Sequence, residues 1–150
     1  MNHLESKNKK IRNATPVNVD GIQFRSKLEA NFYMKAKELD LLDYIKYEPF
    51  KIELQPEFTY QGQKYRPITW TPDFILYHPD GDILCEIKGH PNDAWPMKLK
   101  MILYWMASID SSGRKLHSYE QFMLLKSNKD INNFLKDIKD GRFKLERTRV

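Results

Sequence analysis

The sequence has few of the features that place a small chain in a familiar class. It holds one cysteine, Cys85, so it has no intrachain disulfide and no second cysteine for a zinc site. No apolar run is long enough to cross a bilayer, and the first residues include no apolar stretch of the signal-peptide kind. Internal repeats and low-complexity segments are also missing. We therefore expect one cytoplasmic domain in a reducing compartment, without a membrane partner.

The positive charge of the chain is concentrated at its two ends. The 150 residues are 41% hydrophobic and 13% aromatic, which is enough for one core, and their net charge is +5. Residues 1–12 and 142–150 each hold four basic side chains against one acid. Such ends either displace counterions from nucleic-acid phosphates or are simply solvated. We expect a basic N-terminal arm at 1–20, a single domain at 21–141 and a basic C-terminal tail at 142–150.

Three segments have helical patterns. A helix is expected over residues 26–40, with Ser26 as its N-cap and Glu29 as the capping-box partner three residues later. Residues 96–107 are apolar around nearly the whole circumference, which indicates a buried helix. Residues 128–141 carry an apolar stripe at helical spacing and form the third expected helix.

The segments between these helices have strand patterns. Residues 47–88 alternate between apolar and polar side chains, with turn signals at 61–63 and at Asp80-Gly81. The apolar run at 121–126 has the size of a buried strand. The order helix, three or four strands, helix, strand, helix predicts an α/β fold with a central mixed sheet flanked by helices.

Three charged side chains interrupt the apolar runs of the hairpin TPDFILYHPDGDILCEIKG, residues 71–89. Asp73 lies on its first strand. Glu86 and Lys88 lie on its second strand and project to the same side. Folding at the turn brings Asp73 and Glu86 toward the same end of adjacent strands. Because a buried unpaired charge is costly, these charges either pair with each other or serve a function.

A divalent cation between the two carboxylates would remove their mutual repulsion. Mg²⁺, or Mn²⁺ in its place, would be held by Asp73, Glu86 and the backbone carbonyl of Ile87, together with waters. Such an ion stabilises charge on a phosphate and lowers the pKa of a bound water, which suits phosphodiester hydrolysis. Lys88 would orient that water or neutralise a phosphate oxygen. The alternative is a structural ion pair between Lys88 and one of the acids.

Several motifs together resemble a known superfamily. Pro72-Asp73, twelve residues, and then Glu86-Ile87-Lys88 resembles the motif of the PD-(D/E)XK nucleases. The succession GIQFRSKLEANFY, ELQPEF, the hairpin and MKLK is similar to a family of small phage- and prophage-encoded proteins assigned to that superfamily. The similarity extends over roughly residues 20–105. Nucleases that resolve Holliday junctions or cleave transposon ends carry a set of four residues similar to Glu29, Asp73, Glu86 and Lys88. The resemblance implies a restriction-endonuclease-like core.

The resemblance also implies roles for individual residues. Asp73 and Glu86 would be metal ligands and Lys88 the catalytic lysine. Glu29 would be a further ligand or a base acting through water, and its other interpretation is the helix cap. DNA-contacting residues are expected on the helix after the hairpin and in the N-terminal arm; they are Lys98, Lys100, Lys9, Lys10 and Arg12. Lys98 and Lys100 are about 200° apart on a helix, so at most one can face the site, and Lys98 is favoured because it lies nearer the helix start.

The function expected from these features is Mg²⁺-dependent endonuclease activity on DNA. A chain of 150 residues without a recognition module has little surface for reading a long sequence. Cleavage of branched DNA, as in junction resolution during phage DNA metabolism in the host cytoplasm, is therefore favoured over restriction-like or transposon-end cleavage. Resolution needs two cuts, so a homodimer is expected, with the helix at 96–107 as a candidate interface. The alternative from another class is a non-catalytic nucleic-acid-binding module on the same fold.

Overall fold

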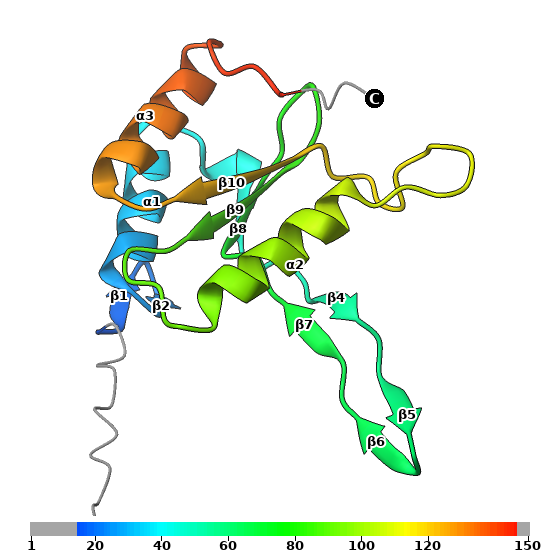
Figure 1. Cartoon of the computed structure of the whole chain (residues 1–150). Helices are drawn as coiled ribbons and strands as arrows, with labels where there is room; N and C mark the ends of the chain where they lie inside the picture. Colours follow the sequence, from blue (N-terminus) through cyan, green and yellow to red (C-terminus); the bar gives the residue numbers. More distant parts are fainter. Residues whose placement is uncertain (1–14, 147–150) are drawn as a thin grey trace, which may run out of the picture.

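A four-stranded mixed sheet forms the centre of the protein in the computed structural model, which describes residues 15–146 (Figure 1). Its strand order is β10-β9-β8-β3, and these strands are Gln121–Leu125, Ile83–Ile87, Phe74–Leu76 and Ile45–Tyr47. β10 runs parallel to β9, whereas β9, β8 and β3 are antiparallel neighbours. The expected α/β fold with a mixed sheet is confirmed.

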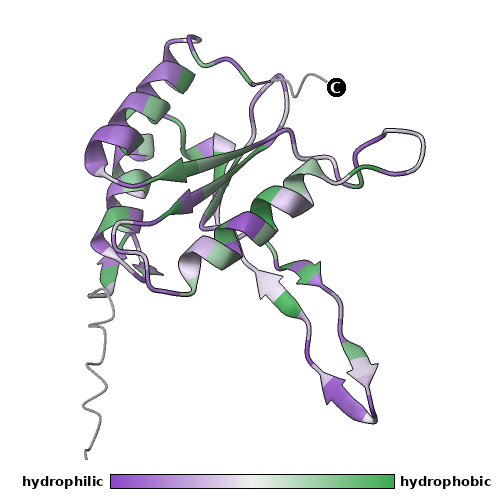
Figure 2. Cartoon of the chain, in the orientation of Figure 1, coloured by the Kyte–Doolittle hydropathy of each residue, from purple (hydrophilic) through white to green (hydrophobic). Residues whose placement is uncertain are grey.

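Helices cover both faces of this sheet. Helix α1 (Lys27–Glu38) and helix α3 (Asn128–Lys139) pack on one face, and helix α2 (Trp95–Ala107) packs on the other (Figure 1). The 3-10 turn η1 (Leu42–Tyr44) leads from α1 into β3. The sheet strands are the most hydrophobic part of the fold, and α1 and α3 turn hydrophilic surface outward (Figure 2). Alternate residues of β8 and β9 therefore contribute to two separate apolar clusters, one on each face.

The two amphipathic helices begin where local chemistry predicts. The Ser26 hydroxyl accepts a hydrogen bond from the backbone N–H of Glu29 at 3.1 Å, and Ser127 caps α3 in the same way. The predicted apolar stripe of α3 is buried, and it includes Ile131, Phe134 and Leu135. Both helices, and a helix α2 starting near Pro96, are confirmed.

Helix α2 is less buried than its composition predicts. Only Trp95 and Ile102 are buried, while Met97 and Leu103 are exposed and Tyr104 is 78% exposed. The expectation of a helix buried around its circumference is wrong. The sheet covers only one side of α2, and within residues 15–146 no element packs over its outer side.

A small hairpin precedes α1. Strand β1 (Val17–Val19) pairs with strand β2 (Ile22–Phe24) through a turn in which Asp20 and Gly21 both have positive φ, 53° and 80°. Asp20 also accepts hydrogen bonds from Tyr33 and Lys37, which tie the hairpin to α1. The expected N-terminal arm is therefore wrong for residues 17–20, which are folded. Lys9, Lys10 and Arg12 lie outside the described residues.

A second, longer hairpin projects from the body, and we call it the β-arm (residues 51–70; Figure 1). Its root pairs β4 (Ile52–Gln55) with β7 (Ile68–Trp70), and its tip pairs β5 (Phe58–Tyr60) with β6 (Gln63–Tyr65). The tip turns at Gln61-Gly62, where a turn was predicted. These strands are not paired with the central sheet.

Within the described residues, no helix combines the length and apolar character needed to cross a membrane.

Candidate active site

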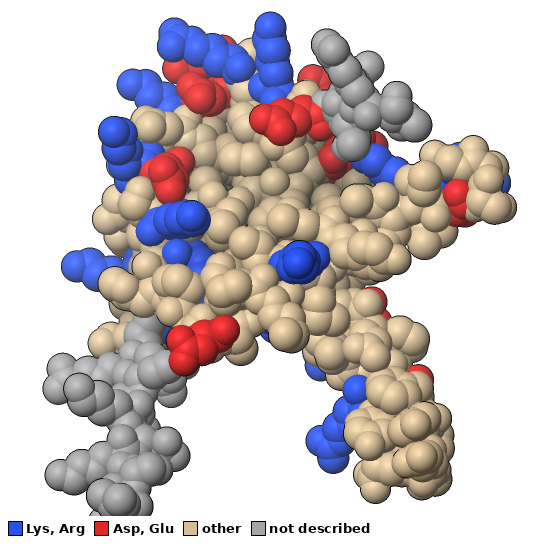
Figure 3. Space-filling model, viewed as in Figure 1, with Lys and Arg blue, Asp and Glu red and all other residues tan. Residues whose placement is uncertain are grey.

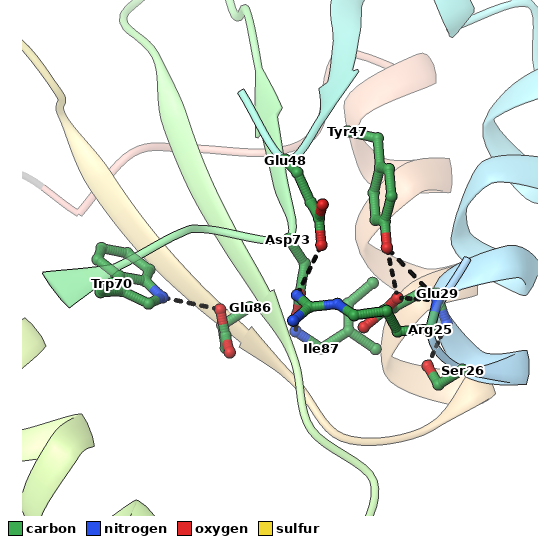
Figure 4. Close-up of polar contacts among 9 residues, drawn as sticks. All are labelled: Arg25, Ser26, Glu29, Tyr47, Glu48, Trp70, Asp73, Glu86 and Ile87. Atoms are coloured by element: carbon green, nitrogen blue, oxygen red, sulfur yellow. Dashed lines mark hydrogen bonds and ion pairs between the residues drawn. The ribbon is translucent and has the colours of Figure 1, made fainter. Parts of the chain in front are cut away.

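The hairpin of β8 and β9 places Asp73 beside the end of β9. The strands pair in register from Leu76 opposite Ile83 to Phe74 opposite Cys85, so the next pair in this register is Asp73 and Glu86. The Asp73 carboxylate turns toward β9, and its Oδ2 accepts a hydrogen bond from the backbone N–H of Ile87 at 2.7 Å (Figure 4). The two acids are therefore brought to the same end of adjacent strands, as the sequence predicts.

Asp73 also meets a basic residue that the sequence pattern does not single out. The Arg25 guanidinium lies 3.4 Å from Asp73 Oδ1 and 2.8 Å from a carboxylate oxygen of Glu48. Arg25 stands directly before the N-cap of α1, and Glu48 follows β3. Glu48 is held close by the bond from its backbone N–H to the carbonyl of Asp73, at 2.8 Å. Arg25 is thus the cation in contact with the acid cluster in the described structure.

Glu86 is buried on the α2 side of the sheet and is anchored by an indole. The Nε1–H of Trp70, at the end of the β-arm, donates to Glu86 Oε2 at 2.9 Å (Figure 4). The positive charges of Lys88, Lys98 and Arg25 favour the ionised form of Glu86. Lys100, by contrast, is exposed and lines a groove with Leu54 and Tyr104.

Glu29, from α1, completes the cluster. Its Oε2 accepts hydrogen bonds from the backbone N–H of Arg25 at 3.0 Å and from the Tyr47 hydroxyl at 2.9 Å. A capping box would use the N–H of Ser26 itself, so Glu29 reaches one residue further back. Burial and the neighbouring Glu29 raise the pKa of Tyr47, which keeps its hydroxyl protonated as a donor. Glu29 therefore serves the helix start and also faces the site (Figure 4).

Crowding of buried negative charge dominates the electrostatics. Burial raises the pKa of Asp73, and the nearby charges of Glu86 and Glu29 raise it further. Burial also raises the pKa of Glu86, although the Trp70 hydrogen bond and the positive charge of Lys88 oppose that shift. Carboxylates in such a place are stable in their ionised form only with a compensating cation.

The three buried carboxylates are held in the same way. Each is anchored by protein donors through one oxygen, as described above for Glu29, Asp73 and Glu86. The opposite oxygens of Glu29 and Glu86 accept no hydrogen bond from the described residues, and that of Asp73 has only the long contact to Arg25. No buried side-chain oxygen in residues 15–146 lacks a partner, so the free oxygens reach solvent. Anchored carboxylates with open oxygens are the donors that hard cations prefer.

The cluster is not a preformed cage. Within the described residues, no three His, Cys, Asp or Glu side chains stand close enough together to hold a metal ion among them. Mg²⁺ commonly binds through one or two carboxylates and keeps several waters, so Asp73 and Glu86 with one backbone carbonyl suit this ion. The residues present fit such a group, with Ile87 and Glu29 as the remaining candidate ligands.

Lys88 does not form the structural ion pair considered from the sequence. Its ammonium lies 4.8 Å from the centre of the Trp95 ring, a cation–π contact, and within residues 15–146 it makes no salt bridge. The side chain is half-buried and remains available to a ligand. Trp95 and Trp70 are both buried beside the site, and Cys85 is a core residue facing the other cluster.

Sequence reasoning missed four contributors to the site, namely Arg25, Tyr47, Glu48 and Trp70 as a hydrogen-bond donor. A signal existed for Trp70, because a buried indole N–H needs an acceptor. Glu48 has a positive φ of 42°, an uncommon backbone conformation for glutamate that the sequence does not reveal. The contacts of the Arg25 guanidinium depend on tertiary structure, since Glu48 and Asp73 lie more than twenty residues away.

Loss of the indole donor should weaken the fold through Glu86. In a double-mutant cycle of Trp70→Phe and Glu86→Met, we expect a coupling energy of about 1.5 kcal/mol, because the bond joins a neutral donor to a carboxylate. Urea unfolding of the parent, both single variants and the double variant measures this quantity. A coupling energy near zero would mean that the bond contributes nothing to stability.

The fold and the site in residues 15–146 together define a class: an α/β protein with three helices around a mixed sheet and buried carboxylates at a strand end. The chain belongs to the family described as "Protein of unknown function (DUF1064)", whose model matches residues 8–117. The match includes the acid cluster, Lys88 and the β-arm, and it ends before β10. No curated protein and no solved structure matches the chain.

Proposed function

We propose that the protein is a metal-dependent endonuclease that hydrolyses phosphodiester bonds in DNA, on a PD-(D/E)XK core. The observation that carries the proposal is the buried Asp73 carboxylate, which lies next to Glu86 in the strand register and feels the charges of Glu86 and Glu29. Each of the three acids is anchored through one oxygen. Acidic residues without a function would lie on the surface, because burying a carboxylate costs folding free energy. A site built at such cost is typical of catalysis.

Asp73, Glu86 and the Ile87 carbonyl would hold Mg²⁺ or Mn²⁺, with Glu29 as a further ligand or a base acting through water. When bound, the ion supplies charge stabilisation at the phosphate and a water of lowered pKa. The anchoring donors of Asp73 and Glu86 fix the carboxylates before substrate arrives, so little reorganisation is needed.

The lysines of the site would act on the substrate. Lys88, half-buried over Trp95, is placed to neutralise a phosphate oxygen or to orient the attacking water. Lys98 sits in the first turns of α2 near Glu86 and would contact the phosphate backbone. Lys100 points to the groove beside the β-arm and is not part of the proposed chemistry.

A second candidate function is favoured by one observation. The contact of Arg25 with Asp73 and Glu48 could be a permanent structural ion pair, in a module that binds nucleic acid without cleaving it. Arg25 is largely exposed, however, with 62% of its side chain accessible, so the pair can open without unfolding the protein. Metal binding separates the two candidates.

The proposal is tested by supplying a four-way junction and a linear duplex of matched sequence with Mg²⁺. We expect cleavage of DNA. A structure-selective dimer should cut the junction about tenfold faster than the duplex, because its two active sites can act on one branch point. Equal cleavage of both substrates would contradict the preference for branched DNA. Absence of cleavage of either, in Mg²⁺ and in Mn²⁺, would contradict the nuclease proposal.

A further inference from the structure

The β-arm exposes its tip on every side. All residues from 56 to 66 are exposed, and the tip strands pair only with each other. At about 3.3 Å per residue, the ten steps from Lys51 to Gln61 span about 30 Å, close to one turn of duplex DNA. A two-stranded ribbon by itself is only marginally stable in water, so the tip of the β-arm contributes little to folding stability and suits a role in binding.

The two faces of the tip differ in chemistry. The register pairs Phe58 with Tyr65 and Tyr60 with Gln63, which places the three aromatic rings on one face. The rings of Phe58 and Tyr65 stack with centroids 5.0 Å apart. Phe58, Tyr60 and Tyr65 are 44%, 61% and 43% exposed. Three half-exposed rings on one face of a ribbon make a stacking platform.

The opposite face of the tip is polar and carries basic side chains. Lys64 pairs with Thr59 on this face and makes an ion pair with Glu57 at 3.3 Å. Arg66, which directly follows β6, is exposed. The tip as a whole is largely uncharged, with basic side chains along one edge (Figure 3).

Both ends of the β-arm join the acid cluster. The chain enters the arm just after Glu48, whose backbone N–H bonds to the carbonyl of Asp73 at 2.8 Å. It leaves the arm at Trp70, which donates to Glu86. A polymer held at the acids is therefore held at the base of the arm and can follow it toward the tip.

We propose that the aromatic face of the β-arm, formed by Phe58, Tyr60 and Tyr65, stacks on unpaired bases of DNA within about one helical turn of the cleaved phosphate. This inference rests on the proposed function, and it specifies the substrate as DNA with bases out of the duplex. Stacking on aromatic rings tolerates any base sequence, because every base has a π-face. Lys64 on the reverse face and the exposed Arg66 after it meet the phosphates of the second strand.

The area of the platform favours bases over a second copy of the chain. Fully buried aromatic side chains cover about 150–250 Å² each, so three half-exposed rings offer roughly 300 Å². A stable dimer interface buries about 800 Å² on each partner. Unpaired bases need no such area, since each stacks on a single ring.

Binding of fluorescent DNA in EDTA tests this inference independently of cleavage. The probe is a duplex with an unpaired loop containing 2-aminopurine, compared with the same sequence fully paired. We expect Tyr60→Val, and the double variant Phe58→Val with Tyr65→Val, to bind the looped DNA about tenfold more weakly than the parent. Valine keeps strand propensity at these positions. The 2-aminopurine emission change of the parent complex should also be lost.

The matched control is Tyr44→Val, a tyrosine 52% exposed at the other end of β3 from the site. It should bind as the parent does. Unchanged binding of looped DNA by the arm variants, or an equal loss for paired DNA, would overturn the inference. So would a parent dimer that these variants convert to monomer in sedimentation. An arm effect in EDTA by a protein that never cleaves DNA would uphold the stacking of unpaired bases on the β-arm and remove the proposed function.

Discussion

Replacing Lys88 with alanine is expected to lower the rate of DNA cleavage by about a hundredfold to a thousandfold. The reason is that Lys88 is a half-buried cation directly after β9, the strand of Glu86, and no salt bridge in residues 15–146 engages it. Its charge is therefore available to the phosphate or the attacking water. Asp73→Ala should be as damaging, because it removes one of the two central carboxylates. Single-turnover cleavage of labelled DNA in excess enzyme and Mg²⁺ measures both losses.

The matched control for Lys88→Ala is Lys100→Ala. Lys100 has the same charge, lies on the following helix and lines a groove with Leu54 and Tyr104. Its removal should change the cleavage rate less than about threefold, as expected for a single screened surface charge. Cleavage that survives both Lys88→Ala and Asp73→Ala would refute the assignment of the site. Equal losses in Lys88→Ala and Lys100→Ala would indicate general phosphate binding instead of a catalytic role.

The parts of the fold that follow from local chemistry could be predicted from the sequence. Ser26 caps α1 because its hydroxyl accepts a hydrogen bond from a free backbone N–H of the first turn. This signal is local, since Ser26 and Glu29 are three positions apart in the sequence. The β8–β9 hairpin turns beside Gly81, which has φ 138°, a conformation that favours glycine. The approach of Asp73 to Glu86 then follows from strand alternation and turn position.

The parts that depend on which surfaces meet could not be predicted in the same way. Alternation at Ile52 and Leu54 indicates strands but does not say that they leave the sheet to form the β-arm. The apolar sequence of α2 indicates burial, yet Tyr104 is exposed, because one sheet face covers only one side of a helix. The β1–β2 hairpin is a different case. Its Asp20-Gly21 turn is a strong local signal that the sequence interpretation passed over.

The residues of the candidate site also fall into a group that could be predicted from the sequence and a group that could not. Glu29, Asp73, Glu86 and Lys88 are found from the sequence because charged residues stand out in apolar runs. Their partners are ordinary in sequence. Tyr47 is a strand aromatic, and only the tertiary structure brings its hydroxyl to Glu29. Arg25 is an exposed basic residue, and its guanidinium reaches Glu48 and Asp73 in the same way. Donors that anchor a site are therefore harder to predict than the acids they anchor.

Asp73→Asn is expected to raise the melting temperature of the metal-free protein by about 5 °C and to abolish its stabilisation by metal. Asp73 is buried beside Glu86 and Glu29, so removing its charge relieves repulsion, while the amide oxygen still accepts the bond from Ile87. A relief of about 2 kcal/mol corresponds to this shift for a chain of 150 residues. The gain in stability would come with a loss of activity, as is common for residues of active sites.

Melting the same proteins with metal ions distinguishes the nuclease from a non-catalytic binding module in which Arg25 is permanently paired with Asp73. At 100 times its dissociation constant, Mg²⁺ or Mn²⁺ should stabilise the parent by about 2.7 kcal/mol, or about 5–10 °C. Asp73→Asn should show no such shift, whereas Asp43→Asn, an exposed acid on η1, should respond as the parent does. A parent that is indifferent to both ions, and that is destabilised by Asp73→Asn, would identify Arg25 as the permanent partner of Asp73. The acids would then be structural, because a cluster that already has its cation gains nothing from another.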